Sequence, residues 1–443
     1  MERPRIWILT PESTPRTLPG GRLAAGPLWL AAALLLLAAQ AQALVGDSRG
    51  MAGLDGSLRL TGLGTANYAH PFAFGGHDSD GLSESLLRLV AAGKPWGWLS
   101  IEGHAVESFS FSTFAPTGAG AGGLDLFGSP QADLRYRAFD AGWTWADANQ
   151  TSARMWLDRL QLRLTLPYLD VTVGRQAISL GKAYFWNPLD VFLPFDPRQV
   201  DREYKPGVDA VRVDIPIGAV SGLNLFAVFG RERAETGAYR EDDFGRASWC
   251  ESALLGRGYT NLGGFDLSLQ GGKVSGGAMV GAALSGEIGP VATRAEASYT
   301  FGSDCPEELA DSFVGVLGVG HRFDNTLDLE AEYLFNGAAA PGDRQESFLR
   351  VARGTSLQVS QHVLGLVATY EILPILHASL ALLVSLADGS GQVQPGLTYS
   401  ISDEADFLFG ALIPWGARPD QLTLESEFGT YPTVFYLEMR FYF

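Results

Sequence analysis

Apolar and polar residues alternate along much of the chain. Residues 160–166 place leucine at every second position, and residues 327–335 place apolar or aromatic residues there, with three carboxylates between them. Side chains of a β-strand alternate between the two faces of the strand, so each segment has one apolar and one polar surface. The same pattern recurs at 169–173, 211–215, 265–269 and 376–380. It predicts an all-β protein with half-apolar strands.

The order of the connections distinguishes between two all-β folds. Short turn signals occur at 94–95, 167–168, 216–222, 261–263, 289–290, 324–326, 373–375 and 402–404. Between them lie mostly longer polar, glycine-rich segments, at 69–84, 112–152, 181–207, 232–249, 273–276, 302–311, 337–360, 387–391 and 414–432. Transmembrane barrels have short periplasmic turns and long extracellular loops, whereas a soluble sandwich has no reason to keep that order.

Eight turns and nine loops separate 18 strands, so the sequence predicts a closed antiparallel transmembrane β-barrel of about 18 strands, with 16 as the alternative count. Residues 134–145 also have a strand-like pattern. A further spanning strand there would invert every later connection. We therefore expect this segment to form a hairpin outside the membrane or an extension of the fourth strand.

The N-terminal segment has the three parts of a secretory signal peptide. Residues 1–27 carry four arginines, residues 28–39 are apolar, and Ala41-Gln42-Ala43 follows as a cleavage site. An apolar stretch of about 12 residues is shorter than the roughly 20 that a transmembrane helix needs. We expect residues 1–43 to be a signal peptide cleaved near Ala43. Residues 44–443 would then form a single barrel in the outer membrane of a Gram-negative bacterium.

The C-terminal segment, residues 433–443, alternates between two faces and ends at Phe443. A terminal strand that ends in phenylalanine resembles the assembly signal of bacterial outer-membrane barrels. This resemblance implies recognition of Phe443 by the barrel-assembly machinery, with outer-membrane lipid and lipopolysaccharide as further partners. Closing the sheet also removes the unpaired strand edge that hydrocarbon does not tolerate.

Composition excludes several other classes of protein. A hydrophobic fraction of 46% with 11% aromatic residues excludes a disordered chain, and 18% charged residues is below the roughly 25% of a soluble domain. The net charge of −17 argues against nucleic acid as a partner. The six histidines show no metal-ligand spacing, so we expect no metal site, no cofactor and no enzymatic activity.

Charged residues on the polar faces indicate a water-filled interior. A basic side chain facing lipid at the bilayer midplane costs about 2–4 kcal/mol. We therefore expect the following residues to line the lumen: Arg59, Arg88, Glu102, Arg159, Arg163, Asp170, Arg212, Asp214, Arg294, Glu296, Asp328, Glu330, Glu332, Glu438 and Arg440. Arg159 and Arg163 would face the carboxylates of 328–332 across the barrel and create a transverse field. The alternative is a set of local salt-bridge networks.

The third long loop is unusually rich in aromatic residues, prolines and charges. Gly174-Arg175-Gln176 precedes it, Asn187-Pro188-Leu189-Asp190-Val191-Phe192 lies within it, and Asp201-Arg202-Glu203-Tyr204 follows. Over about 35 residues, from Gly174 to Asp209, the sequence resembles bacterial outer-membrane porins of the alginate-export type. The resemblance implies an 18-stranded diffusion channel with an inward-reaching loop. Alginate channels have strongly basic pores, and the mixed charges here depart from that, so the solute stays open.

The residues of loop 181–207 themselves suggest a pore constriction. Its prolines stiffen the segment, and Phe185, Trp186, Phe192 and Phe195 could attach it to the inner wall. Charged groups at a narrowing set ion selectivity. The candidate constriction residues are Arg175, Asp190, Asp201, Arg202, Glu203 and Lys205. The alternative is a surface lid held by internal ion pairs.

By strict alternation along its strand, the side chain of Arg175 would face lipid. We therefore expect it to lie above the bilayer or after a bulge. Cys250 and Cys305 both fall in predicted extracellular loops and could form a disulfide in an oxidising compartment, although their spacing leaves this open.

The sequence thus predicts an outer-membrane porin for passive or substrate-selective diffusion of small hydrophilic solutes, in an unknown oligomeric state. The alternative is a structural barrel, serving as an adhesion platform or as a sheath around a periplasmic partner such as an electron carrier.

Overall fold

A computed structural model describes residues 45–46, 52–66, 79–113, 134–148, 150–200, 202–232, 244–274, 276–303, 310–352, 354–420 and 423–443. The predicted signal peptide (1–43), Asp201 and Cys305 lie outside the described residues. The strands are β1 (Val45–Gly46), β2 (Ala52–Ala66), β3 (Gly81–Trp96), β4 (Leu99–Ser112), β5 (Gly142–Ala148), β6 (Thr151–Thr165), β7 (Asp170–Gln176), β8 (Val208–Ile217), β9 (Ser221–Val228), β10 (Ala253–Leu262), β11 (Phe265–Val274), β12 (Gly277–Ile288), β13 (Val291–Phe301), β14 (Ser312–Arg322), β15 (Asp328–Asn336), β16 (His362–Leu373), β17 (Leu376–Ser385), β18 (Gly391–Ser402), β19 (Ala405–Trp415) and β20 (Thr433–Tyr442).

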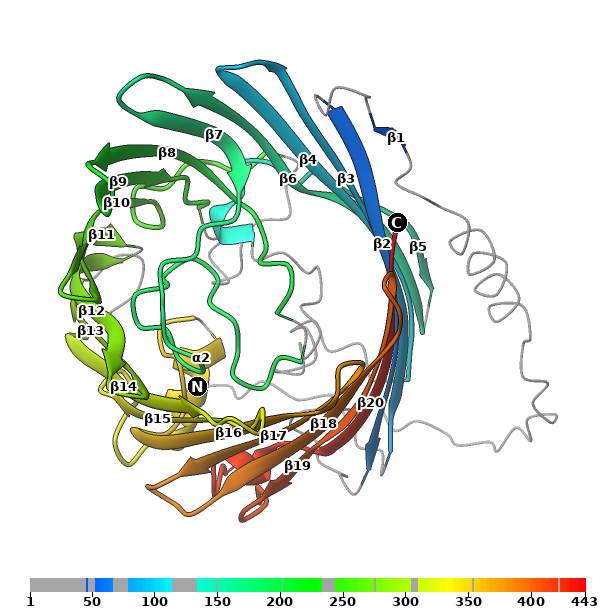
Figure 1. The fold of residues 1–443 in the computed structure, drawn as a ribbon. Helices are drawn as coiled ribbons and strands as arrows, with labels where there is room; N and C mark the ends of the chain where they lie inside the picture. The colour runs from blue at the N-terminus through cyan, green and yellow to red at the C-terminus, as the bar shows by residue number, and fades with distance from the viewer. Residues whose placement is uncertain are drawn as a thin grey trace, which may run out of the picture. The chain divides into compact units, whose positions relative to one another are not determined.

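Eighteen of these strands, β2–β4 and β6–β20, form one closed antiparallel barrel (Figure 1). The last strand pairs with the first, with Ser57 opposite Tyr442 and Ala66 opposite Thr433. Gly56 and Phe443 extend this seam, because each donates its backbone N–H to the other's carbonyl, at 2.7 and 2.9 Å. The prediction of an 18-stranded barrel is confirmed, and the count of 16 is not needed.

The short turns alternate with longer connections as the sequence predicted. They lie at 97–98, 166–169, 218–220, 263–264, 289–290, 323–327, 374–375 and 403–404. The first predicted turn, at 94–95, was misplaced, because β3 continues through Lys94 and Pro95 to Trp96. The register between β3 and β4 shifts between Gly93 and Trp96, so the proline lies at an irregularity in the ladder. Proline lacks an N–H to donate, and such bulges are where a strand accommodates it.

Strand β5 explains the additional strand-like segment. It pairs with residues 151–156 of β6, whereas β7 pairs with residues 160–165 along the same edge. β7 ends at Gln176, and β5 therefore continues the wall beyond the end of β7. The segment before it contains a short 3-10 helix, η2 (Leu134–Tyr136). In the described part of this region, 134–148, no additional spanning strand is formed, and all later connections keep their expected side.

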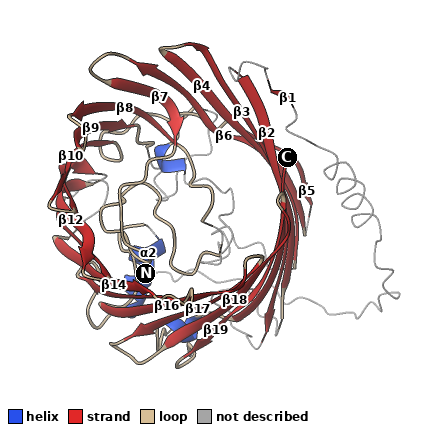
Figure 2. Ribbon diagram, in the orientation of Figure 1, coloured by secondary structure: helices blue, strands red, loops and turns tan. Residues whose placement is uncertain are grey.

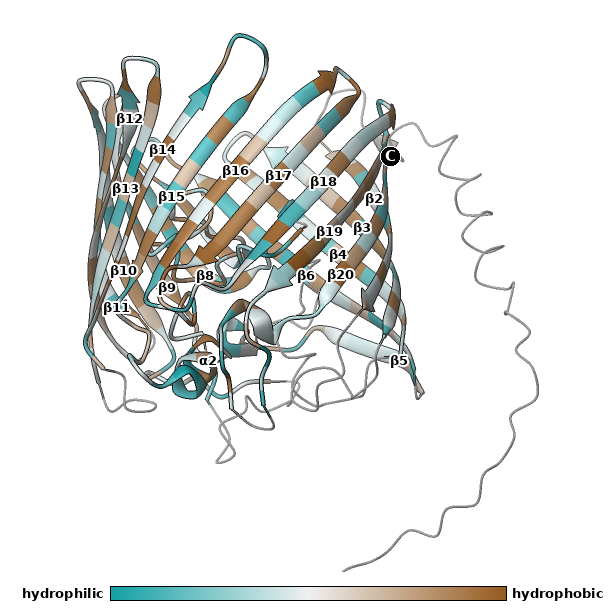
Figure 3. Ribbon diagram, turned by 90° about the horizontal axis from the view of Figure 1, so that it is seen from below, coloured by the Kyte–Doolittle hydropathy of each residue, from teal (hydrophilic) through white to brown (hydrophobic). Residues whose placement is uncertain are grey.

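The two faces of the wall differ in polarity along every strand. Figure 3 shows the alternation of hydrophobic and hydrophilic bands. Leu269 and Leu317 are 69% and 63% exposed on the outer face, whereas Val314, Val316 and other inward residues are buried. Leucines this exposed on β11 and β14 exclude a sandwich with the same residues packed between two sheets.

Among the residues that the structure describes, helical structure is confined to η2, α2 (Arg344–Ala352) and η3 (Phe428–Thr430). Figure 2 shows loop segments running through the interior of the ring of strands. Within the described residues, no helix has both the length and the apolarity needed to cross a membrane.

The outer face can be tested at Leu317, in the middle of β14. We expect Leu317→Arg to lower the free energy of unfolding in lipid by about 2–4 kcal/mol, because the guanidinium would face hydrocarbon. Ser379→Arg is the matched control. Ser379 lies four residues before the inward-facing Leu383 on β17, so it faces the interior, and it is exposed there. Urea unfolding in lipid vesicles measures both. Equal losses would contradict the assigned faces.

Candidate functional site

The segment between β7 and β8, residues 177–207, runs through the interior of the barrel (Figure 1). We call it the inner loop. Its apolar residues Ile178, Leu180, Leu189 and Phe192 form one buried cluster with inward residues of β8, β9, β10 and β12. Its Phe185 and Trp186 form a second cluster with inward residues of β14–β17, Phe428 and Tyr431. The inner loop is therefore attached to one side of the inner wall by hydrophobic burial.

Two glycines of the wall make room for these side chains. A Cβ on Gly365 would lie 2.6 Å from a ring carbon of Phe185, and a Cβ on Gly281 would lie 2.4 Å from Leu189. Real Cβ atoms do not approach other atoms so closely, so any larger residue at these positions would displace the loop. Inward-facing glycines opposite an aromatic loop were a signal in the sequence that our predictions did not use.

Two buried carboxylates hold the start of the inner loop. Glu296 on β13 accepts hydrogen bonds from the backbone N–H groups of Lys182 and Ala183, the latter at 2.9 Å. Glu332 on β15 accepts from the N–H groups of Tyr184 and Phe185, the latter at 2.7 Å. These bonds satisfy backbone donors that the aromatic cluster would otherwise leave buried and unpaired. Both residues were predicted to line the lumen, and the structure places them against the loop.

Three predicted constriction residues brace the loop instead of facing open space. Asp190 and Lys205 are 7% and 5% exposed, and their carboxylate and ammonium groups lie 2.5 Å apart. Burial raises the pKa of Asp190, against the attraction of Lys205. Arg202 donates to the carbonyls of Tyr184 and Pro197 at 3.0 and 2.9 Å. In this structure the loop uses these three side chains to pair its own polar groups, and the charged constriction stays a prediction.

Arg175 also has a different role from the predicted one. It belongs to β7, is 2% exposed, and donates to both carboxylate oxygens of Asp209, at 2.8 and 3.1 Å. Its other donors bond the carbonyls of Leu157 and Phe139, at 2.9 and 2.6 Å. Arg175 thus satisfies backbone acceptors at the point where β7 ends and residues 137–141 cross toward β5. It is part of the wall, not of a constriction.

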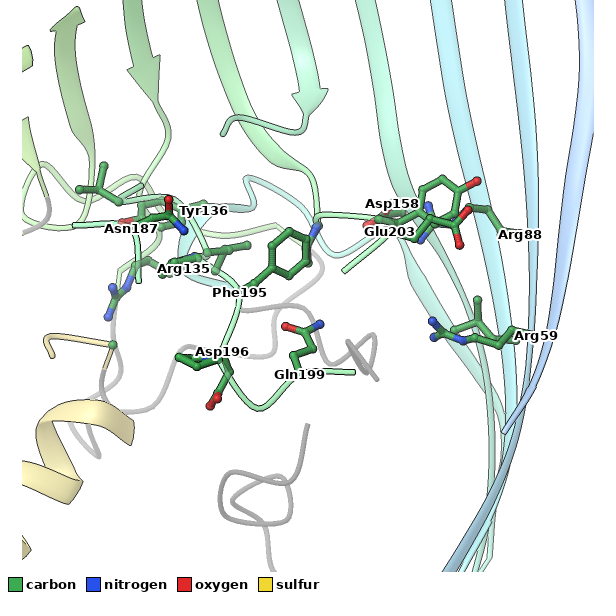
Figure 4. A pocket seen from close by; sticks show the side chains of 18 of the residues that line it. Arg59, Arg88, Arg135, Tyr136, Asp158, Asn187, Phe195, Asp196, Gln199 and Glu203 are labelled. Carbon is green, nitrogen blue, oxygen red and sulfur yellow. Dashed lines mark hydrogen bonds and ion pairs between the residues drawn. The ribbon is translucent and has the colours of Figure 1, made fainter. Parts of the chain in front are cut away.

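The open space lies on the other side of the inner loop. A cavity of about 350 Å³ lies between much of the loop and β2, β3, β6 and β20, and we call it the arginine cavity. The end of the loop contacts this wall, because Arg159 donates to the carbonyl of Lys205 at 3.0 Å and Arg88 lies over the ring of Tyr204. Figure 4 shows Arg59 and Arg88 projecting from wall strands toward the loop segment that carries Phe195 and Gln199. Further lining groups are Arg137, Trp156, Asp158, Glu203, Tyr204, Arg440 and Tyr442.

Arginines and carboxylates in this cavity form two linked groups. Glu438, fully buried, lies 3.7 Å from Arg59 and 2.5 Å from Arg440. Asp158 lies 2.7 Å from Arg88 and 3.6 Å from Arg137. In both groups one carboxylate is shared by two guanidinium ions, so these pairs alone leave positive charge facing the cavity.

Arg137 is the least satisfied of these arginines. It is 1% exposed, and among the described residues its Nε and Nη1 atoms have no hydrogen-bond partner. Burial, followed by repulsion from Arg175, lowers the pKa of Arg137 to about 10, so the side chain stays charged at neutral pH. Buried donors without partners are costly, and an anionic solute could supply the missing acceptor.

Sequence reasoning placed Arg59, Arg88 and Arg440 on the lumen side but missed Asp158 and Arg137. Asp158 is the additional residue of an irregularity in β6, where His104 pairs with Arg159 and Ala105 with Leu157. Strict alternation therefore assigns Asp158 to the wrong face. Arg137 lies just after η2, in the segment that looked like a hairpin, and only its position in the fold reveals it.

The remaining predicted lumen charges have local partners. Arg163 contacts Asp170, Arg212 lies 2.8 Å from Asp214, Arg159 lies 3.9 Å from Glu102, and Arg294 makes two bonds of 2.7 Å with Glu330. Asp328 begins β15, in register with Arg322. Arg294 neutralises Glu330, and Glu332 accepts hydrogen bonds from the inner loop. The charges therefore form local salt-bridge networks, and Arg159 and Arg163 do not face an unpaired set of carboxylates across the barrel.

Cys250 is disulfide-bonded, and Cys305 lies outside the described residues. Across the described part of the chain, no group of three or more His, Cys, Asp or Glu side chains could hold a metal ion.

No family model matches the chain, and no curated relative matches it. Similar solved structures are OccAB4 and OccAB3 of Acinetobacter baumannii, each with a TM-score of 0.54. They are 9% and 11% identical to this chain, and the likeness covers 90% and 88% of it and 100% and 99% of them. OpdK of Pseudomonas aeruginosa, solved with vanillate, is 10% identical, with a TM-score of 0.52 and coverage of 88% and 98%.

These neighbours are bacterial outer-membrane porins. The likeness concerns the fold. At such low identity it assigns no residue of the arginine cavity.

The attachment of the inner loop can be tested by filling the space at Gly365. We expect Gly365→Val to displace Phe185 at a cost of about 1–3 kcal/mol, because overpacking forces neighbouring groups to move. Trypsin should then cleave the folded barrel after Arg198 or Arg202, as read by mass spectrometry. Gly258→Val is the control, since a Cβ there meets nothing within 4 Å. Identical digestion of both variants would refute the attachment.

Proposed function

We propose that this protein is an outer-membrane channel for small hydrophilic solutes that carry a carboxylate. The observation that carries the proposal is the unequal inner wall: the inner loop is packed against β8–β12 and β14–β17, and the arginine cavity stays open beside β2, β3, β6 and β20. A volume of about 350 Å³ is within the range of small-molecule sites. Solutes of that size would pass the loop on its arginine-lined side.

The chemistry of the cavity supports the carboxylate class. Arg59, Arg88, Arg137 and Arg440 offer guanidinium donors, which bind carboxylates in charge-assisted hydrogen bonds. Trp156, Phe195, Tyr204 and Tyr442 supply aromatic surface for the body of the solute. An aromatic or other partly apolar carboxylate fits both sets of groups. Vanillate, the molecule named with the neighbour OpdK, belongs to this class.

The inner loop argues against a barrel that encloses a protein partner, because it already occupies the interior that such a partner needs. We therefore favour the channel over the sheath. That the barrel has no enzymatic role also remains a proposal.

Finer features also remain proposals. The resemblance of residues 174–209 to alginate-export porins supports a channel with an inward-reaching loop. Phe443, which closes the barrel against Gly56, would be recognised by the barrel-assembly machinery, and lipopolysaccharide would contact the outer wall. We further propose that Cys250 pairs with Cys305 on the extracellular side.

The channel is tested by conductance in planar bilayers. We expect open-channel currents, and we expect Arg59→Gln to reduce the chloride-to-potassium permeability ratio by about twofold, because a charge at a narrow region sets selectivity. Arg163→Gln is the matched control, since Arg163 lies outside the arginine cavity and pairs with Asp170. Reversal potentials in a salt gradient measure both. A purified barrel that does not conduct would refute the proposal.

Export is tested on the mature protein. We expect the N-terminal sequence of the outer-membrane form to begin at Leu44, because signal peptidase cleaves after a small-x-small pattern such as Ala41-Gln42-Ala43. Edman sequencing of protein from outer-membrane fractions shows this directly. Retention of residues 1–43 would contradict it.

A further inference from the structure

Glu203 is the one carboxylate of the inner loop that reaches across the arginine cavity to the opposite wall, among the described residues that line it. Its Oε2 accepts a hydrogen bond of 3.2 Å from the hydroxyl of Tyr442 and lies 4.0 Å from Nη1 of Arg440. Both partners belong to β20, so this side chain joins the two sides of the passage.

This contact is loose, whereas the backbone on either side is held firmly. Arg202 bonds two loop carbonyls, and Lys205 is buried against Asp190 at 2.5 Å. The Glu203 side chain is 33% exposed, against 8% for that of Asp190. An ion pair of 4.0 Å that is partly open to water is weak, and Tyr204 adds a hydrogen bond to the same carboxylate. The side chain can therefore leave its partners by rotating about its own bonds, with the loop unchanged.

Charge counting gives Glu203 a specific role. The arginines that line the cavity are five: Arg59, Arg88, Arg135, Arg137 and Arg440. The carboxylates facing them are also five: Asp158, Glu438 and Glu251, which form ion pairs with them, Glu84, which acts electrostatically on Arg59, and Glu203. Asp196 also lines the cavity, but it is paired with Arg198. When Glu203 rotates away, one positive charge is left over, and a solute with one carboxylate restores the balance.

We infer that Glu203 is a tethered competitor, whose carboxylate holds the Arg440 and Tyr442 position until a solute carboxylate displaces it. The inference rests on the proposed channel function and adds the group that sets its affinity. A solute and Glu203 present the same chemical group to the same donors, so they exclude each other. Competition keeps solute binding weak, and weak binding is what release from a channel requires.

The inference is tested with benzoate as a probe on the purified full barrel in planar bilayers, by titrating benzoate block of the ionic current. If Glu203 occupies the position for about nine-tenths of the time, Glu203→Gln tightens the apparent benzoate affinity about tenfold, because apparent affinity scales with the free fraction of the site. Glu346→Gln is the matched control. It removes the same charge from α2, where Glu346 pairs with Arg350 and neither side chain lines the cavity, and it should leave the affinity unchanged.

A second variant separates the tether from charge alone. Glu203→Asp keeps the charge but is one methylene shorter, so its carboxylate should no longer reach the Tyr442 hydroxyl. We expect this variant to tighten benzoate binding while its reversal potential stays near that of the unmodified channel.

Each outcome decides one of the two proposals. If the channel conducts and binds benzoate but the Glu203 variants bind it no more tightly than Glu346→Gln does, the role of Glu203 as a competitor is overturned. The proposed channel function then stands. A conducting channel that benzoate does not block overturns both the carboxylate class and the competitor. A barrel without conductance overturns the channel itself.

Discussion

The pairing of backbone N–H and C=O groups is the constraint on which this structure depends. Hydrocarbon offers these groups no partner, so the sheet must close, and β20 returns to β2 with Gly56 and Phe443 extending the seam. Where the ladder is interrupted, other groups complete it. Arg175 bonds two carbonyls at the end of β7, and β5 takes over the edge of β6 that β7 no longer covers.

Closure creates an interior, and the inner wall divides that interior into two unequal parts. One side carries buried apolar residues and two glycines that receive the aromatic side chains of the inner loop, together with Glu296 and Glu332 that bond its backbone. The other side carries arginines that share carboxylates. The loop packs against the first side, and its position defines which strands line the arginine cavity.

Charge inside the barrel is organised over short distances. Many ionisable groups meet a partner on the same strand or one or two strands away, so the interior is highly charged but nearly balanced locally. In a screened, water-filled space such pairs leave little long-range field. Under the proposed channel function, selectivity depends on the groups that line the open space, and Arg137, with two unsatisfied donors among the described residues, is one of them.

The sequence by itself determined the barrel, its 18 strands and the order of turns and loops, because alternation and turn signals are local properties of the chain. It also indicated the unusual composition of residues 177–207. Only the tertiary structure decided which charges face the passage. Asp158 faces inward because of an irregularity in β6. Asp190 forms an ion pair with Lys205, 15 residues later, and Arg175 forms one with Asp209 on the next strand. These outcomes depend on contacts between distant residues, and such contacts exist only once the chain has closed on itself.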